Sequence, residues 1–311
     1  MGSLTIICGK KENPEMLIDE FERYLSGTKK MSANTIEAYR RDIDAYTRFL
    51  TARGKEPDQA TNTDVVAYLM DLKSAGKSRS TVNRKLASLR IFYKFLISTG
   101  RMTADPTEEI KSPKIARKDI DYISYEDVLA LLETPDNSIK GKRDRALFEV
   151  LYATGVRVSE IIEMKLSDVN LRMGFVSCSG THGRARIVPM GVPAKEALMD
   201  YLEHSRRIML KDQDPDDPSS MLFVNYLGEP MTRQGFWKIL KQYGEKAGIE
   251  DKLTPQTLRN SFAMHMVQNG IDIKSLQELM GHEDISATQV YFGDQKNRIK
   301  DVYDRCHPRA K

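Results

Sequence analysis

Helical spacing of apolar residues over the first hundred positions is the feature that most constrains how this chain can fold. Residues 14–54 carry apolar side chains at intervals of three and four, which predicts two amphipathic helices. The same spacing predicts a third helix over residues 63–74 and a fourth over residues 80–99. Helices that each have one apolar face bury those faces against one another. The sequence therefore predicts a small four-helix bundle.

Cations gather on the polar faces of this expected bundle. Residues 73–118 contain twelve basic and three acidic side chains. Such a surplus suits contact with a phosphate backbone, although a solvated helix face would have the same composition. The candidate DNA contacts lie in the turn before the second helix and on the fourth helix. They are Lys29, Lys30, Ser32, Arg79, Asn83, Arg84 and Arg90. We expect most of them to meet phosphates, which position a protein without reading bases.

A basic segment punctuated by prolines divides the chain. Residues 103–118 include Pro106 and Pro113 and lack apolar periodicity, which is typical of a linker. The whole chain of 311 residues also exceeds what one hydrophobic core usually organises. We therefore expect a helical DNA-binding domain over residues 1–108, a linker over residues 109–121 and a second domain over residues 122–311.

The second domain combines helical and strand patterns. Helical spacing recurs over residues 125–132 and 142–152. Two short apolar runs, residues 175–178 and 186–189, are typical of strands joined by a glycine-containing turn. Most of the remaining sequence is helical in character. The chain is therefore expected to be mainly α, with one small antiparallel β-sheet in its second domain.

Several classes of protein are disfavoured by the composition. No stretch approaches the roughly 18 consecutive apolar residues that a membrane span needs, so we expect a cytoplasmic protein without membrane contact. The three cysteines, Cys8, Cys178 and Cys306, are odd in number and lack CxxC spacing. They predict neither a disulfide framework nor a zinc site. No carboxylate cluster suited to magnesium is evident, and we expect no metal and no cofactor.

Three motifs in the second domain carry chemistry in a fixed order. Residues 153–160 read ATGVRVSE and contain Arg157, while residues 279–282 read LMGH and end at His282. Arg259 lies 23 residues before His282, and Tyr291 lies nine residues after it. This order and spacing resemble those of the tyrosine recombinase (integrase) family, in particular its Xer-type site-specific recombinases. Because the basic helical first domain also fits, the resemblance covers nearly the whole chain.

The resemblance implies a fold and a reaction. The fold is a SAM-like DNA-binding bundle followed by the tyrosine recombinase catalytic domain. Arg157 and Arg259 would grip the nonbridging oxygens of a DNA phosphate in place of metal ions, because guanidinium groups bind phosphate bidentately. His282 would complete this clamp. The Tyr291 hydroxyl would attack phosphorus to form a 3′-phosphotyrosyl link, which stores the bond energy so that rejoining needs no ATP.

Two positions depart from the family pattern. In Xer-like members the hairpin resembles G-K-G-x-K-x-R-x-V-P, and its first lysine protonates the leaving 5′ oxygen. Here residues 180–189 read GTHGRARIVP, so Thr181 replaces that lysine, and His182 or Arg184 would substitute for it only in part. Residues 254–263 read TPQTLRNSFA where the family resembles T-P-H-x-L-R-H-S-F-A. Both histidines of this pattern are therefore replaced, the first by Gln256 and the second by Asn260, and Gln256 cannot shuttle a proton.

Three functions remain compatible with the sequence. The first is a site-specific recombinase that works slowly with substitute proton donors, and the second is a catalytically impaired paralogue that binds DNA or assembles with an active partner. The third is an all-helical transcription or RNA-binding factor, which leaves the spacing of Arg157, Arg259 and Tyr291 unexplained. The resemblance implies double-stranded DNA as partner and a homo-tetramer or hetero-tetramer on paired sites. Chromosome dimer resolution in chromosome segregation and DNA integration of a mobile element both remain open.

Overall fold

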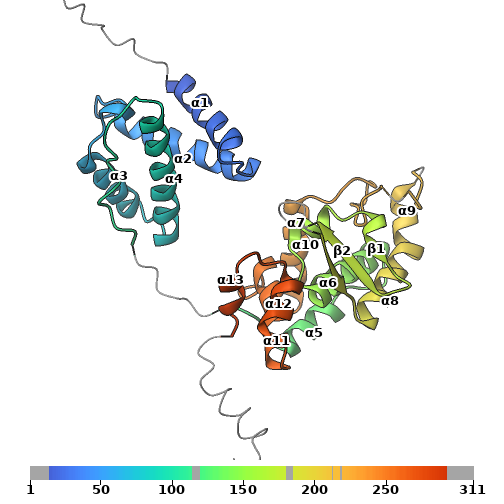
Figure 1. Cartoon of the computed structure of the whole chain (residues 1–311). Helices are drawn as coiled ribbons and strands as arrows, with labels where there is room; N and C mark the ends of the chain where they lie inside the picture. Colours follow the sequence, from blue (N-terminus) through green and yellow to red (C-terminus); the bar gives the residue numbers. More distant parts are fainter. Residues whose placement is uncertain (1–13, 114–119, 180–184, 212, 218, 293–311) are drawn as a thin grey trace, which may run out of the picture. The chain divides into compact units, whose positions relative to one another are not determined.

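The chain is described from a computed structural model, which covers residues 14–113, 120–179, 185–211, 213–217 and 219–292. It forms two compact units, residues 1–118 and residues 119–311, each with its own hydrophobic core (Figure 1). The division between the units falls inside the expected linker. The precise ends of that linker stay a prediction.

The first unit is the expected helical bundle. Its elements are α1 (Pro14–Gly27), α2 (Ala33–Thr51), the short 3-10 helix η1 (Pro57–Gln59), α3 (Asn62–Ser74) and α4 (Arg79–Ser98). Ser78 caps α4 by accepting a hydrogen bond from the backbone N–H of Thr81, which explains why the helix begins there. Aromatic rings fill the core, with Phe21 edge-on to Phe92 at a centroid distance of 5.2 Å.

The second unit is mainly helical, as expected. Its helices up to the sheet are α5 (Tyr125–Glu133), α6 (Ile139–Thr154), α7 (Val158–Ile162) and the 3-10 turn η2 (Leu166–Asp168). After the sheet come α8 (Val192–Tyr201), the π-helix η4 (Leu202–Arg206), α9 (Arg207–Leu210), α10 (Arg233–Lys246), α11 (Pro255–Gln268), α12 (Ile273–Met280) and α13 (Ile285–Gln289). Residues 146–151 of α6 are all buried, and the helix forms the centre of the core.

The sheet has three antiparallel strands in the order β1 (Val169–Asn170), β2 (Phe175–Ser179) and β3 (Ala185–Pro189). Strands β2 and β3 confirm the expected pair. The sequence analysis missed β1, because a two-residue strand is too short to show alternation. Val176 pairs with Val188, and both side chains are buried in the core. Helix α12 packs on β3.

A second, smaller cluster of buried apolar residues lies at the C-terminal end of this unit. Helices α11, α12 and α13 lie together there (Figure 1) and bury Phe262, Leu276, Met280 and Tyr291. No helix among the described residues is long and apolar enough to cross a membrane. Cys178 is buried, and burial raises the pKa of its thiol to about 11, whereas Cys8 and Cys306 lie outside the described residues.

Candidate functional site

Arg157 is positioned by a sharp turn between α6 and α7. Gly155 ends α6 with φ +57°, a left-handed conformation that favours glycine. A Cβ at this position would lie 2.1 Å from the Cδ1 atom of Phe262, so the space is also closed to any side chain. Arg157 follows directly as the N-cap residue of α7. The turn therefore fixes Arg157 against α11, the helix that carries Phe262.

Helix α11 brings three further polar side chains to the same place. Thr254 caps the helix by accepting a hydrogen bond from the backbone N–H of Thr257, at 3.0 Å, and Pro255 occupies its first turn. Gln256, Arg259 and Asn260 then follow at intervals of three and four residues. Residues at this spacing lie on one helix face. The helix start thus determines where all three point.

Arg259 is held by backbone oxygens at the C-terminal ends of two helices, α6 and α12. Its guanidinium donates hydrogen bonds to the carbonyl of Gly155 and, at 2.5 Å, to the carbonyl of Met280. The side chain is only 6% exposed. Burial, together with the positive charge of Arg157, lowers the pKa of Arg259 to about 10, so the group is still a cation at neutral pH. A buried arginine with few anionic partners is suited to receive an anion.

Arg157 shares a carboxylate with two other arginines. Its Nη1 atom donates to Oε1 of Glu160 at 3.2 Å, and its Nη2 donates to the carbonyl of Gly281 at 3.3 Å. Glu160 also accepts two hydrogen bonds from Arg186, at 2.7 and 2.8 Å, and lies 4.0 Å from Arg259. Burial opposes the charge on Glu160, but these hydrogen bonds and cations hold the pKa of its carboxyl below its usual value. Three cations thus surround one carboxylate.

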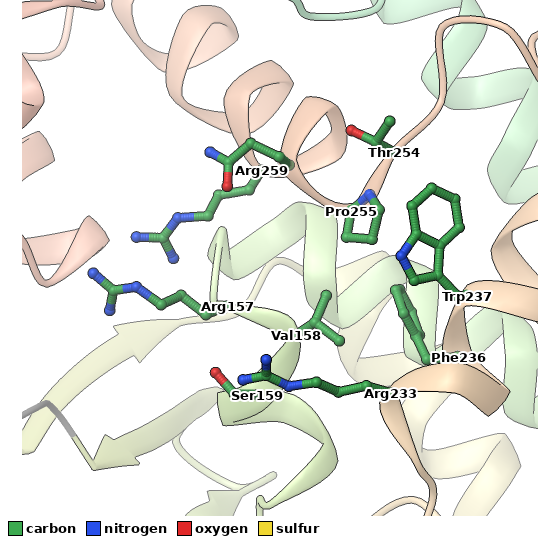
Figure 2. Close-up of a pocket in the computed structure, with 10 residues that line it drawn as sticks. Arg157, Val158, Ser159, Arg233, Phe236, Trp237, Thr254, Pro255 and Arg259 are labelled. Carbon is green, nitrogen blue, oxygen red and sulfur yellow. The ribbon is translucent and has the colours of Figure 1, made fainter. Parts of the chain in front are cut away.

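The two predicted arginines open onto one pocket of about 400 Å³. Figure 2 shows the side chains of Arg157 and Arg259 running toward the same edge of this pocket, with Arg233 of α10 approaching near Ser159. The pocket is lined by polar and aromatic side chains from α7, α10 and α11. These are Arg157, Val158, Ser159, Arg233, Phe236, Trp237, Thr254, Pro255, Gln256 and Arg259. Three guanidinium groups around one cavity form a site for an anion such as phosphate.

His282 lies directly beside Arg259. Its Nε2 atom is 3.5 Å from Nη2 of Arg259, and its Nδ1 atom is 2.8 Å from the hydroxyl of Thr288. Because arginine has only donors, Nε2 faces it as an acceptor, and Nδ1–H donates to Thr288. Burial first, and then the charges of Arg259, Arg157 and Arg186, lower the pKa of His282 to about 4. The imidazole is therefore neutral at pH 7 in the free protein.

Tyr291 stacks on His282 but its hydroxyl is turned to Asn260. The two rings are nearly parallel, with 9° between their planes and 6.3 Å between centroids. The hydroxyl donates to Oδ1 of Asn260 at 3.0 Å. Burial raises the pKa of Tyr291, against the opposing charges of Arg259 and Arg157. The structure brings Arg157, Arg259 and His282 together, whereas Tyr291 adjoins them without facing the pocket.

The predicted DNA contacts of the first unit have several roles within the fold. Ser32 caps α2, Arg84 forms an ion pair with buried Asp42, and the amide of Asn83 donates to the carbonyl of Pro113 at 2.9 Å. Arg90 donates to Ser112 at 3.1 Å and to the carbonyl of Ile110. Asn83 and Arg90 thus hold the segment that follows the bundle. Their role as DNA contacts, and that of Lys29, Lys30 and Arg79, stays a prediction.

The sequence analysis assigned no role to three residues of the site. Glu160 and Arg186 neutralise each other beside the arginines, and Asn260 binds the tyrosine hydroxyl. Glu160 could have been found from its position three residues after Arg157, which is the spacing of a capping box. The structure contains this contact, because the backbone N–H of Arg157 donates to the Glu160 carboxylate at 2.7 Å. Thr181, His182 and Arg184 lie outside the described residues. Among the residues that are described, no cluster of metal-binding side chains occurs.

The comparisons with known proteins match both units of the chain. The phage integrase family matches residues 121–298, and the phage integrase N-terminal SAM-like domain matches residues 18–100. The tyrosine recombinase XerD of Listeria innocua is 43% identical over 297 residues, which cover 94% of this chain and 99% of that protein.

Two solved structures share the fold. One is the XerH site-specific recombinase bound to a palindromic difH substrate, with a TM-score of 0.71 at 18% identity and coverage of 97% of this chain and 98% of that one. The other is a lambda integrase tetramer bound to a Holliday junction, with a TM-score of 0.67 at 17% identity and coverage of 89% of this chain and 76% of that one.

The helical bundle, the arginine-lined pocket and these matches together define a class of proteins that exchange DNA strands. The chain belongs to the phage integrase family of tyrosine recombinases. It binds DNA and acts in site-specific recombination, in the manner of XerD. The alternative of a helical transcription or RNA-binding factor is wrong, because the family match spans both units.

Proposed function

We propose that Arg157, Arg259 and His282 bind the scissile phosphate and that Tyr291 is the nucleophile that cleaves the strand. One observation carries this proposal. An unbroken series of contacts runs from Arg157 through Glu160 to Arg259, from Arg259 to His282 at 3.5 Å, and from His282 to the ring of Tyr291. Side chains linked in this way can act on one phosphate after a small movement of the tyrosine.

The reaction itself is a transesterification. The Tyr291 oxygen attacks phosphorus, the bond between phosphorus and the 5′ oxygen breaks, and the leaving strand takes up a proton as its 5′ hydroxyl. The proton on the tyrosine must also be lost. Arg157 and Arg259 stabilise the negative charge that develops on the nonbridging oxygens, because their charges are already in place before the reaction begins.

His282 is the described side chain best placed to follow the charge of the phosphate. In the free protein its low pKa of about 4 results from burial and from the neighbouring arginines. A bound phosphate offsets the positive charges of Arg259 and Arg157, and it therefore raises the pKa of His282. The imidazole would then donate a hydrogen bond to a phosphate oxygen. DNA binding is thus expected to be accompanied by partial uptake of a proton.

A second candidate function is a recombinase homologue that binds DNA and assembles but cleaves poorly. Two features favour it: Gln256 and Asn260 offer amides where the family pattern has histidines, and Thr181 replaces the general-acid lysine. Losing one general acid or base typically lowers a rate by about 10² to 10⁴. An impaired enzyme of this kind would still need an active partner subunit to complete strand exchange.

For assembly, we propose a tetramer of identical or related subunits on two DNA duplexes, in the cytoplasm where bacterial DNA lies. The lambda integrase tetramer on a Holliday junction supports this arrangement through its shared fold. Residues 296–303 lie outside the described residues, but Ile299, Val302 and Tyr303 have helical spacing in the sequence, and we propose that this segment docks on a neighbouring subunit. Deletion from Ile299 onward should weaken assembly on DNA but leave the binding of single subunits to DNA unchanged.

A nicked suicide substrate separates the two candidate functions. Loss of the short strand next to the nick prevents rejoining, so an active enzyme accumulates as a covalent protein–DNA adduct. An adduct with the wild-type protein that is absent in Tyr291→Phe supports cleavage through this tyrosine. A mobility shift of the same DNA without any adduct, at every pH tried, supports the impaired homologue. An adduct that persists in Tyr291→Phe contradicts the assignment of the nucleophile.

A further inference from the structure

Two amide side chains converge on the hydroxyl of Tyr291. Asn260 Oδ1 accepts a hydrogen bond from the tyrosine hydroxyl at 3.0 Å and a second one from Nε2 of Gln256 at 2.8 Å. Both residues occupy positions where the family pattern has histidines. The two replacements therefore belong together, because the amides of Gln256 and Asn260 are hydrogen-bonded to each other.

The backbone fixes which way Asn260 faces. Its Nδ2 atom donates to the carbonyl oxygen of Asp121 at 2.9 Å. An amide has its donor and acceptor on opposite sides, so this bond leaves Oδ1 to face Gln256 and Tyr291. Asn260 is 9% exposed and Tyr291 is 7% exposed, and water therefore has little access to this hydrogen bond. The tyrosine hydroxyl is consequently held as a donor.

An amide carbonyl accepts a hydrogen bond but does not take up the proton. An imidazole in the same place would do both. The charged and titratable groups around Tyr291 are His282 on its ring face, and Arg259 and Arg157 beyond it. Arginine side chains cannot accept the tyrosine proton, and the acceptor atom of His282, Nε2, is directed to Arg259 and not to Tyr291. Among the described residues, the hydroxyl itself forms a hydrogen bond only with Asn260.

Gln256 connects this arrangement to the phosphate pocket. Its side chain lines the cavity together with Arg157 and Arg259. A phosphate held by the arginines would present its oxygens to the amide donor of Gln256. Nε2 of Gln256 has two N–H donors, and one of them serves Asn260. A phosphate in the pocket would draw this amide toward itself and away from Asn260. Phosphate binding would therefore weaken the support of Asn260 and, with it, the hold on Tyr291.

We propose that Asn260 is a positioning residue that holds Tyr291 protonated and turned away from the pocket, and that Gln256 releases this hold when a DNA phosphate enters. The proposal rests on the proposed role of Tyr291 as nucleophile. Under this proposal, cleavage is coupled to occupancy of the phosphate pocket. The tyrosine proton then leaves to solvent and is not taken up by the residue at position 256.

The first experiment measures the position of Tyr291 and does not depend on activity. The protein is labelled with [¹³Cζ]tyrosine, and the Tyr291 signal is assigned by its absence in Tyr291→Phe. In the wild-type protein this signal should shift when intact duplex DNA is added. In Asn260→Leu and Gln256→Met it should already lie near its DNA-bound position before DNA is added. Gln268→Met, at the far end of α11, is the matched control and should behave as wild type.

The second experiment is the pH profile of adduct formation on the suicide substrate. The wild-type rate should rise about tenfold per pH unit between pH 6 and 8, because the proton leaves to hydroxide. Gln256→His should level off above about pH 6.5, where its imidazole becomes a free base. A wild-type rate that is flat over this range would show that His282 or another base takes the proton, and would overturn this part of the proposal.

The two experiments distinguish failure of the inference from failure of the proposed function. A Tyr291 signal that is the same in Asn260→Leu, Gln256→Met and wild type overturns the positioning role, whatever the activity. A signal that moves as expected while no protein forms an adduct supports the positioning role and contradicts the proposed cleavage activity. Gln256→Met keeps the length of the side chain and lies on a partly exposed helix face, so it remains informative if Asn260→Leu does not fold.

Discussion

Arg186 donates two hydrogen bonds, of 2.7 and 2.8 Å, to the two carboxylate oxygens of Glu160. A third donor of the same guanidinium, Nε, binds the carbonyl of Leu279 at 2.9 Å. Strand β3 is thereby tied to α7 and to the loop that carries His282. The pair is 11% and 9% exposed, so little water competes for it. The arginine balances a carboxylate that would otherwise attract the phosphate-binding arginines.

Removing Arg186 is therefore expected to damage both stability and cleavage. Arg186→Met leaves Glu160 buried with Arg157 as its remaining close cation, and this should lower the free energy of unfolding by about 3 kcal/mol. The released carboxylate should also strengthen its existing ion pair with Arg157 and attract Arg259, which is only 4.0 Å away. Adduct formation on a suicide substrate should fall on the order of tenfold or more, at a saturating concentration of DNA.

Arg172→Met provides the control for this prediction. Arg172 is an exposed residue between β1 and β2, and its replacement should change neither the denaturation midpoint nor the rate of adduct formation. Stability is measured by chemical denaturation and binding by mobility shift. An Arg186→Met protein that cleaves DNA at the wild-type rate would show that Glu160 does not compete for the phosphate-binding arginines.

Gly155 should tolerate no side chain. In Gly155→Ala the new Cβ would lie 2.1 Å from Cδ1 of Phe262, and the residue would keep a φ of +57°. Left-handed strain of about 1–2 kcal/mol adds to overpacking of about 1–3 kcal/mol, so the second unit should lose about 3 kcal/mol of stability. The carbonyl of Gly155 also holds Arg259, so any displacement of the turn should lower adduct formation as well.

Gly54→Ala is the matched substitution in the first unit. Gly54 has a φ of +71°, but no atom lies within 4 Å of the Cβ position. Only the backbone strain remains, and the expected cost is about 1–2 kcal/mol. Thermal denaturation of both variants compares the two cases directly. Equal losses in both proteins would mean that Phe262 moves aside at no cost.

The sequence predicted the four α-helices of the first unit, and α5 and α6 of the second, because their signals are local. Apolar spacing and capping residues such as Ser78 and Thr254 mark helix positions without reference to the rest of the fold. The order of Arg157, Arg259 and Tyr291 was likewise readable, since a family pattern preserves it. Two structural relationships were not readable. Glu160 pairs with Arg186 across 26 residues, and Tyr291 bonds Asn260 across 31. Such contacts depend on how distant segments pack, which periodicity does not encode.

Two arginines of α4 allow a role in DNA binding to be distinguished from a role in stabilising the fold. Arg79 is exposed and has no ion pair within the part of the chain that the structure describes, whereas Arg84 pairs with buried Asp42. Arg79→Ala should leave stability within about 0.5 kcal/mol. Arg84→Ala should lower it by about 1–2 kcal/mol, since Lys85 still holds Asp42 at 2.8 Å.

Both substitutions should weaken DNA binding if these arginines meet phosphates. Each lost contact lowers the slope of log Kd against log salt concentration by about 0.9. The measurement is a binding titration between about 50 and 200 mM salt, paired with a melting curve. An unchanged salt slope in Arg79→Ala would remove Arg79 from the DNA contacts. An unchanged melting curve in Arg84→Ala would show that the Asp42 pair contributes nothing to the fold.

His282 should make the free protein sensitive to mild acid. Its pKa is about 4 in the folded protein, against an ordinary value of 6.5, because burial and three arginines disfavour the imidazolium. Between these two values the unfolded chain binds a proton that the folded chain does not. Stability is therefore complete above about pH 6.5 and falls progressively as the pH drops toward 4. His282→Asn retains a donor toward Thr288 without titrating, and its stability should fall less over the same range.

Comparing wild type with His282→Asn isolates the contribution of His282, because His265, whose pKa is also lowered, is the same in both proteins. Burial also lowers the pKa of His265, so His265 contributes to acid lability equally in the wild-type and variant proteins. His204→Asn is the control, since that side chain is 60% exposed. Melting temperatures are measured from pH 4 to 7.5 with and without duplex DNA. A bound phosphate should raise the pKa of His282 and so reduce the difference between wild type and His282→Asn. The same difference with and without DNA would mean that His282 does not sense the phosphate.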